Sequence, residues 1–124
     1  MTIRLAIVAD DDDDARYLVA TALRKAGFGV SEAVDGLELL SLAEGVDFSK
    51  WLVVSDIGMP GCDGISVTQT LRGLAPNVPI VLITAYTDLE TRRSALGAGA
   101  DRVLHKPLDL TQLVSTVVEL ADRP

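Results

Sequence analysis

The segment Ile7–Val19, IVADDDDDARYLV, joins an apolar run to a helical pattern through five consecutive aspartates. The residues from Ile3 to Ala9 form a short apolar run of the kind found in buried strands. After the aspartates, apolar residues recur at helical spacing as far as Gly27, which ends the predicted helix. The segment therefore predicts a strand, an acidic turn and a helix, which together form the first βα unit of an α/β fold.

Four more apolar runs alternate with four more helical patterns along the rest of the chain. The predicted strands are Phe28–Val34, Trp51–Ser55, Val78–Thr84 and Asp101–His105. The helices that follow them are expected to begin at the capping residues Asp35, Asp63, Thr87 (in the capping box TDLE) and Asp109. The helix after Thr87–Glu90 has few apolar residues, so we expect it to be the least firmly anchored. This alternation predicts a parallel sheet of five strands with helices on both faces.

Length and composition limit the classes of protein to which the chain can belong. Its 124 residues suit one domain, 1–124, in which residues 121–124 resemble the start of a linker. A net charge of −7 argues against binding to nucleic acid or to an anionic membrane, and favours a divalent cation or a basic protein surface. The single cysteine, Cys62, excludes an internal disulfide, and the first residues lack a signal-peptide pattern. We therefore expect a cytoplasmic location.

Polar residues lie at the carboxyl ends of four predicted strands. Asp10 and Asp11 follow the first strand, Asp56 follows the third, Thr84 ends the fourth and Lys106 follows the fifth. Parallel sheets bind ligands beyond these ends, so the side chains are expected to converge. Three converging carboxylates repel one another, and Mg²⁺, which prefers oxygen ligands, would relieve the repulsion. A carboxylate nucleophile beside a lysine, a hydroxyl and Mg²⁺ suits phosphoryl transfer through an aspartyl phosphate, with Asp56 as the best candidate for the nucleophile.

Four short motifs make the chain similar to the receiver domains of response regulators in bacterial two-component signalling. The motifs are ADD after the first strand, SDIGMPGCDG after the third, TA after the fourth and KP after the fifth. Each is weak alone, but their order and their position at strand ends extend the resemblance from Ile3 to about Leu120. The resemblance implies a three-layer (βα)5, flavodoxin-like fold in which the strands lie in the order 2-1-3-4-5.

The same resemblance implies roles for individual residues. Asp56 matches the phosphoacceptor, and Thr84 and Lys106 match the residues that hold phosphate oxygens. Lys106 also precedes Pro107, in a peptide bond that is usually cis in the family. Asp11 is expected to touch Mg²⁺ directly and Asp10 largely through water. The complete set of implied metal ligands is Asp10, Asp11, Asp56 and the backbone carbonyl of Gly58.

The function implied by the resemblance is that of a switch, with no catalysis beyond its own phosphorylation and slow dephosphorylation. A histidine kinase or a phosphotransfer protein would donate the phosphoryl group. The surface of the fourth helix, fifth strand and fifth helix would then change and contact an output domain, a downstream protein or a second copy in a homodimer. Arg92, Arg93 and Arg102 are candidate contacts on that surface, and Val103 occupies a position where many relatives carry an aromatic ring.

Two other functions stay open at this point. An aspartyl-phosphate hydrolase of the haloacid-dehalogenase type needs a second aspartate where this chain has Gly58, and a substrate cap for which the chain is short. A pseudo-receiver would bind a partner without phosphorylation, but all the signature positions are filled here. The remaining aspartates, Asp12–Asp14, match no signature position and are expected to begin the first helix, where acidic residues favour the positive end of the helix dipole.

Overall fold

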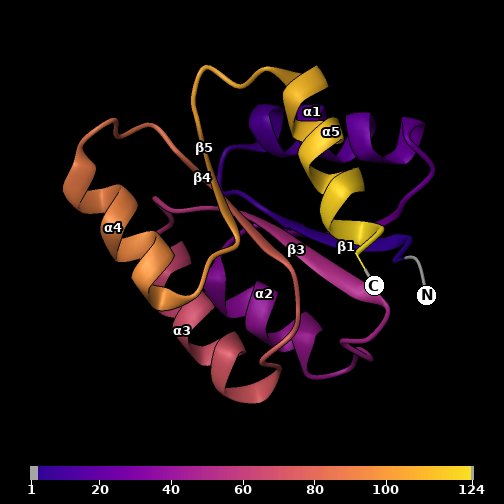
Figure 1. Ribbon diagram of the computed structural model, residues 1–124, viewed down its shortest axis with the longest axis horizontal. Coiled ribbons are helices and arrows are strands. Elements are labelled where there is room, and N and C mark those ends of the chain that lie inside the picture. The colour runs from indigo at the N-terminus through magenta and orange to yellow at the C-terminus, as the bar shows by residue number, and fades with distance from the viewer. Residues whose placement is uncertain (1–2, 124) are drawn as a thin grey trace.

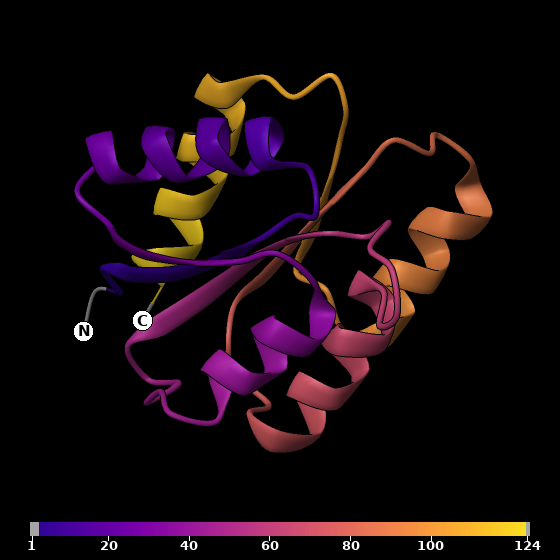
Figure 2. The same cartoon turned by 180° about the vertical axis from the view of Figure 1, so that it is seen from behind.

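A computed structural model describes residues 3–123 as a parallel sheet between two layers of helices (Figure 1). The strands are β1 (Leu5–Ala9), β2 (Gly29–Ala33), β3 (Trp51–Asp56), β4 (Ile80–Thr84) and β5 (Arg102–His105). The helices are α1 (Asp13–Lys25), α2 (Gly36–Ala43), α3 (Gly64–Leu74), α4 (Leu89–Ala98) and α5 (Leu110–Ala121). The strand order β2-β1-β3-β4-β5 confirms the predicted flavodoxin-like topology. Helices α1 and α5 lie on one face of the sheet, and α2, α3 and α4 lie on the other (Figure 2).

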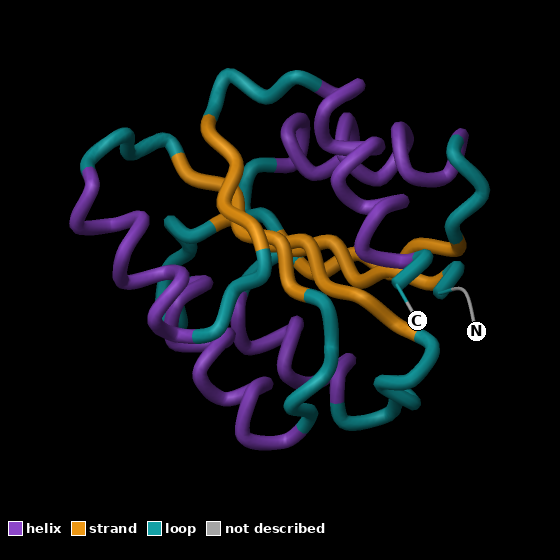
Figure 3. The backbone as a smooth tube through the Cα atoms, in the orientation of Figure 1, coloured by secondary structure: helices purple, strands orange, loops and turns teal. Residues whose placement is uncertain are grey.

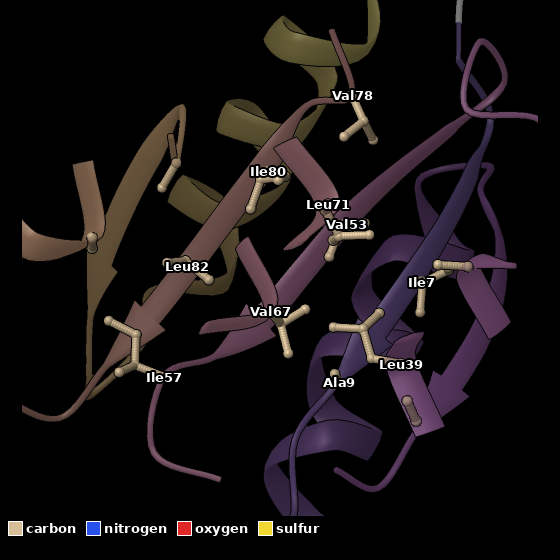
Figure 4. Packing of buried hydrophobic residues seen from close by; sticks show 14 of the residues in the cluster. Ile7, Ala9, Leu39, Val53, Ile57, Val67, Leu71, Val78, Ile80 and Leu82 are labelled. Atoms are coloured by element: carbon tan, nitrogen blue, oxygen red, sulfur yellow. The ribbon is translucent and has the colours of Figure 1, made fainter. Parts of the chain in front are cut away.

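Two hydrophobic cores form, because successive side chains of each strand point to opposite sides and helices cover both faces of the sheet. One core lies between the sheet and α2, α3 and α4, and it includes Ile7, Leu39, Val53, Leu71 and Leu82 (Figure 4). The other core lies under α1 and α5, and it includes Val8, Leu23, Val54, Leu113 and Val117. Figure 3 shows the sheet between the two layers of helices that cover these cores. The strand ends therefore remain as the places where the sheet can present polar side chains.

An aspartate caps each of the helices α1 to α5. Its side chain accepts a hydrogen bond from a backbone amide in the first turn, and the capping residues are Asp12, Asp35, Asp63, Asp88 and Asp109. The structure thus confirms the predicted caps at Asp35, Asp63 and Asp109. The prediction of Thr87 as a cap is wrong by one residue, because the Asp88 carboxylate accepts from both the amide and the hydroxyl of Thr91. One carboxylate satisfies two donors there, and Thr87 stays outside the helix.

Several strand boundaries also differ from the predicted ones by one or two residues; β1, for example, begins at Leu5 instead of Ile3. Strand β4 begins at Ile80 instead of Val78, because Pro79 has no amide hydrogen to donate to the ladder. Ala121, which was expected at the start of a linker, is buried as the last residue of α5. Residue 124 of the expected linker lies outside the described residues. Each helix within residues 3–123 is too short or too polar to cross a membrane.

Candidate functional site

Three aspartates meet at the carboxyl edge of the sheet. Asp10 and Asp11 lie in the turn after β1, and Asp56 ends β3, the strand that pairs with β1. One carboxylate oxygen from each residue lies within 4.8 Å of the others. Asp10 and Asp56 are only 4% and 7% exposed, whereas Asp11 is exposed to solvent. The predicted convergence of these carboxylates is therefore confirmed as geometry.

Lys106 provides the positive charge nearest to these carboxylates. Its Nζ lies 3.2 Å from Oδ1 of Asp56 and 3.5 Å from Oδ2 of Asp10. The lysine follows β5, and its backbone amide donates to the carbonyl of Thr84 at 2.8 Å. The Lys106–Pro107 peptide bond is cis, as the resemblance implied. Lys106, which follows the edge strand β5, thus bridges two of the three acids.

The electrostatics of the cluster show an excess of negative charge. Burial raises the pKa of the Asp56 carboxyl, the charge of Asp10 raises it further, and Lys106 opposes the shift only in part. Burial lowers the pKa of Lys106, but the charges of Asp56 and Asp10 outweigh it, and the net shift is upward. Three carboxylates facing one lysine form a set of hard oxygen ligands with uncompensated charge. Such a set fits Mg²⁺, which binds through one or two carboxylates and keeps several waters.

Thr84 and Gly58 complete the set of predicted residues at this edge. Thr84 ends β4 and is 1% exposed, and its Oγ1 accepts a hydrogen bond from the amide of Tyr86 at 2.9 Å. Gly58 lies in the loop after β3, where a Cβ atom added to it would be 3.8 Å from Oδ2 of Asp56. All the residues singled out from the strand ends therefore gather at one edge of the sheet.

Two residues that determine the backbone conformation of this site were not predicted from the sequence. Gly64 begins α3, and a Cβ atom there would lie only 2.5 Å from the carbonyl oxygen of Asp56, so a side chain at this position would displace the loop. Arg16 in α1 donates from Nη1 to the carbonyl oxygen of Asp10 at 2.9 Å. The glycine directly after the capping residue Asp63 was a sequence signal for the close approach at Gly64. The second had no local signal, because it depends on how α1 packs.

An apolar groove of about 330 Å³ adjoins the acidic cluster. It runs between α1 and the segment after β5, with Asp10 and Lys106 at its polar end. Its other lining residues are Ala15, Leu18, Val19, Ile83, Pro107, Leu108 and Leu110. Leu18 is 54% exposed, although it is one of the apolar residues whose helical spacing predicts the buried side of α1. The groove therefore offers apolar surface to a partner beside the carboxylates.

A more polar hollow of about 580 Å³ lies on the surface formed by α4, β5 and α5. Its lining includes Val103 together with the basic or titratable side chains of Arg92, Arg102 and His105. Arg102 also pairs with Glu119 of α5 at 3.3 Å. This hollow is the part of the surface where the resemblance implied an aromatic ring in many relatives.

Comparison with protein families and with curated proteins gives consistent results. The model of the response regulator receiver domain matches residues 6–118. The transcriptional regulatory protein PrrA of Mycobacterium tuberculosis is 39% identical over 117 residues, which cover 94% of this chain and 49% of PrrA. The transcriptional regulator NtrC of Escherichia coli is 33% identical over 110 residues, which cover 89% of this chain and 23% of NtrC. The chain thus spans about half the length of PrrA and less of NtrC.

Solved structures resemble the fold along nearly the whole chain. The receiver domain of the Francisella response regulator 1452 superimposes with a TM-score of 0.89 at 31% identity, over 97% of this chain and 98% of that one. The chemotaxis protein CheY4 of Vibrio cholerae superimposes with a TM-score of 0.87 at 28% identity, over 95% and 98% of the two chains.

Proposed function

Because the chain belongs to the response regulator receiver domain family, we propose that it is a signalling switch that accepts a phosphoryl group on Asp56. One observation carries the proposal: the buried Asp56 carboxylate lies within 4.8 Å of two other carboxylates and 3.2 Å from the ammonium of Lys106. A purely structural ion pair would not need this excess of acids. In this proposal, residues 1–124 act as a single receiver domain.

The proposed reaction transfers one phosphoryl group. An oxygen of the Asp56 carboxylate attacks phosphorus as the bond between phosphorus and the donor breaks, and the bonding electrons leave with the donor. The ammonium of Lys106 holds one phosphoryl oxygen, and the hydroxyl of Thr84 donates to another. Water later attacks phosphorus as the bond between phosphorus and the Asp56 oxygen breaks, which releases inorganic phosphate and returns Asp56 to its carboxylate form.

The proposed metal ligands are the Asp10, Asp11 and Asp56 carboxylates with the carbonyl of Gly58. When bound there, Mg²⁺ supplies positive charge that balances the carboxylates and the incoming phosphoryl oxygens. Asp11 is the exposed member of the cluster and so has room for a direct bond to the ion. Asp10 is already engaged by Lys106 and by the amide of Asp12, which leaves it a more indirect role.

The proposed donor is a histidine kinase or a phosphotransfer protein. The apolar groove between α1 and the segment after β5 supports this choice, because it ends at Asp10 and Lys106. A helix carrying a phosphohistidine can bury apolar side chains against Leu18 and Pro107 while its phosphoryl group faces Asp56. A small phosphodonor would reach the same carboxylate without using the groove.

The proposed output surface consists of α4, β5 and α5. Phosphorylation draws the Thr84 hydroxyl toward the phosphoryl group, and the loop from Ala85 to Asp88 moves with it as a shift between two existing states. Arg92, Arg93 and Arg102 are the proposed contacts to an output domain, a downstream protein or a second copy of the chain. Support for this location comes from the weak anchoring of α4, in which only Ala95 is buried.

A phosphorylation assay with intact mass measurement tests the function directly. Incubation with a small acyl phosphate and Mg²⁺ is expected to add the mass of one phosphoryl group, and a metal chelator is expected to prevent this. Asp56→Asn should gain no mass, while the matched control Asp47→Asn, an exposed aspartate in the loop before β3, should gain mass normally. A full adduct on Asp56→Asn would disprove the assignment, and no adduct on the wild type would favour the pseudo-receiver.

A further inference from the structure

Arg16 connects three separate groups around the turn that carries the acidic pair. Its Nη1 donates to the carbonyl oxygen of Asp10 at 2.9 Å, and its Nη2 donates to Oδ1 of Asp13 at 2.7 Å. Its Nε donates to Oε1 of Glu32, on β2, at 3.2 Å. The side chain is only 13% exposed, so it is held within the fold. The pKa of Arg16 is raised, mainly by its hydrogen bond to Asp13.

The bond to the Asp10 carbonyl matters because it fixes the peptide plane that leads into Asp11. The Asp10 amide is held on its other side by the carbonyl of Ala33 at 3.1 Å. The Asp10 carboxylate accepts from the amide of Asp12 at 2.9 Å, which closes the turn. Asp11 itself is exposed, so the direction of its carboxylate depends on the backbone that carries it.

We infer that Arg16 is a positioning residue for the metal site: by holding the turn after β1, it orients the Asp10 and Asp11 carboxylates toward Mg²⁺. The inference rests on the proposed function, because it concerns the same metal ligands. Arg16 touches neither the phosphoryl group nor the ion in this role. It acts through the backbone of Asp10.

The three contacts use three different nitrogens of the Arg16 guanidinium. A guanidinium offers five N–H donors in a rigid fork, whereas an ammonium is a single point of charge. A lysine at this position would keep the charge and lose the simultaneous bonds to Asp10, Asp13 and Glu32. The positioning role therefore depends on the shape of the side chain, and a lysine variant can distinguish this role from the effect of the charge.

Charge and positioning predict opposite effects on Mg²⁺ affinity. Removing a positive charge near three carboxylates makes the site more negative, which favours a cation. Releasing the turn allows Asp10 and Asp11 to leave the orientation that binds the ion, which disfavours it. Residues that orient metal ligands typically change affinity by about tenfold or more when replaced. A measured loss of affinity in a neutral variant would therefore identify positioning as the larger effect.

The test is a calorimetric Mg²⁺ titration of the full chain as wild type, Arg16→Gln, Arg16→Lys and Arg24→Gln. Arg24 is the matched control, because it donates to the other oxygen of Glu32 at 3.2 Å and to the carbonyl of Val30. We expect both Arg16 variants to bind Mg²⁺ about tenfold more weakly and Arg24→Gln to bind as the wild type does. Affinity equal to or tighter than the wild type in both Arg16 variants would overturn the inference.

A second readout works without metal and separates this inference from the proposed function. Amide hydrogen exchange of Asp12 in the metal-free protein reports the bond to the Asp10 carboxylate. Exchange should accelerate in both Arg16 variants and stay unchanged in Arg24→Gln, while amides of the core strands stay protected in all of them. Unchanged Asp12 exchange would show that Arg16 does not hold the turn, whether or not the wild type accepts a phosphoryl group.

Discussion

At Asp56, burial and ionisation oppose each other. The carboxylate is 7% exposed, and burial, followed by the charge of Asp10, raises its pKa. A pKa raised in the folded state means that ionising this group reduces the free energy of unfolding. The reduction is absent below the pKa of the unfolded state and complete above the raised pKa of the folded state. Metal-free protein therefore loses stability as the pH rises through that range.

Asp56→Asn is expected to raise the free energy of unfolding of the metal-free protein at neutral pH, by on the order of 1 kcal/mol. The gain should disappear at acidic pH, where Asp56 of the wild type is protonated. Urea unfolding in the presence of a chelator, repeated across this pH range, measures the difference. Asp14→Asn is the control, because Asp14 is exposed in the first turn of α1. Equal gains in both variants would point to net charge instead of burial.

The polar residues at the strand ends were predictable because the strands are parallel. Once the apolar runs are recognised, Asp10, Asp56 and Lys106 must emerge at the same edge of the sheet. Arg16 and Gly64 were not recognised, because their importance depends on distances across the fold. Arg16 in helix α1 reaches Glu32 on strand β2, and no periodicity in the sequence reports such a contact.

Helix α4 is anchored unequally at its two ends. Its N-terminal end is held by the exposed cap Asp88, while Leu89 and Leu96 are exposed and only Ala95 is buried. At the other end, Arg72 of α3 donates to the carbonyl of Gly99 at 2.9 Å and pairs with Asp101 at 2.9 Å. The helix is therefore expected to move at its N-terminal end, which the loop from Ala85 to Asp88 connects to Thr84, while its C-terminal end stays fixed.

Arg72→Met is expected to release the fixed end of α4 and to lower the free energy of unfolding by roughly 2 kcal/mol, through lost hydrogen bonds from a charged group. In the wild type, phosphorylation should accelerate amide exchange at the start of α4 more than at Leu96–Gly99. In Arg72→Met, both ends should exchange quickly. Arg93→Met, an exposed position of the same helix, should behave as the wild type does. Equal amide exchange at both ends of α4 in the phosphorylated wild type would contradict the expected movement about a fixed C-terminal end.

The elements themselves were predicted more reliably than their boundaries. Alternating apolar runs and helical patterns report burial, which the helices on both faces of the sheet impose most strongly on β1, β3 and β4. Boundaries depend on single hydrogen bonds, as when Asp88 is the cap instead of Thr87 because it satisfies two groups of Thr91. The weak anchoring of α4 was foreseen from its sparse apolar residues, but the bonds of Arg72 that fix its end were not.

The proposed donor groove and helix α4, which is one part of the proposed output surface, lie on different faces of the sheet. The groove beside Leu18 lies on the face covered by α1 and α5, whereas α4 covers the opposite face (Figure 2). A donor protein can therefore occupy the groove without covering α4. Transfer from a protein donor should depend on the groove, whereas phosphorylation by a small molecule should not.

Leu18→Ala is expected to slow phosphotransfer from a protein donor by roughly tenfold, since about 1.4 kcal/mol of apolar contact corresponds to that factor. Phosphorylation by a small acyl phosphate should be unchanged. The control is Leu37→Ala on α2, which truncates a leucine that is 67% exposed on the other face. Equal slowing with the protein donor and the small donor would assign the effect to the site itself and exclude the groove.

The first and last described segments lie close together (Figure 1). They are hydrogen-bonded at the amino ends of the strands, whereas the acidic cluster lies at the carboxyl ends. The amide of Ile3 donates to the carbonyl of Ala121 at 3.0 Å, and Arg4 pairs with Asp122 at 3.5 Å. The position of β1 in the sheet therefore does not require it to come first along the chain. A circular permutant, with the ends joined by a short flexible linker and a new start between Ser49 and Lys50, should fold and accept a phosphoryl group on the same aspartate.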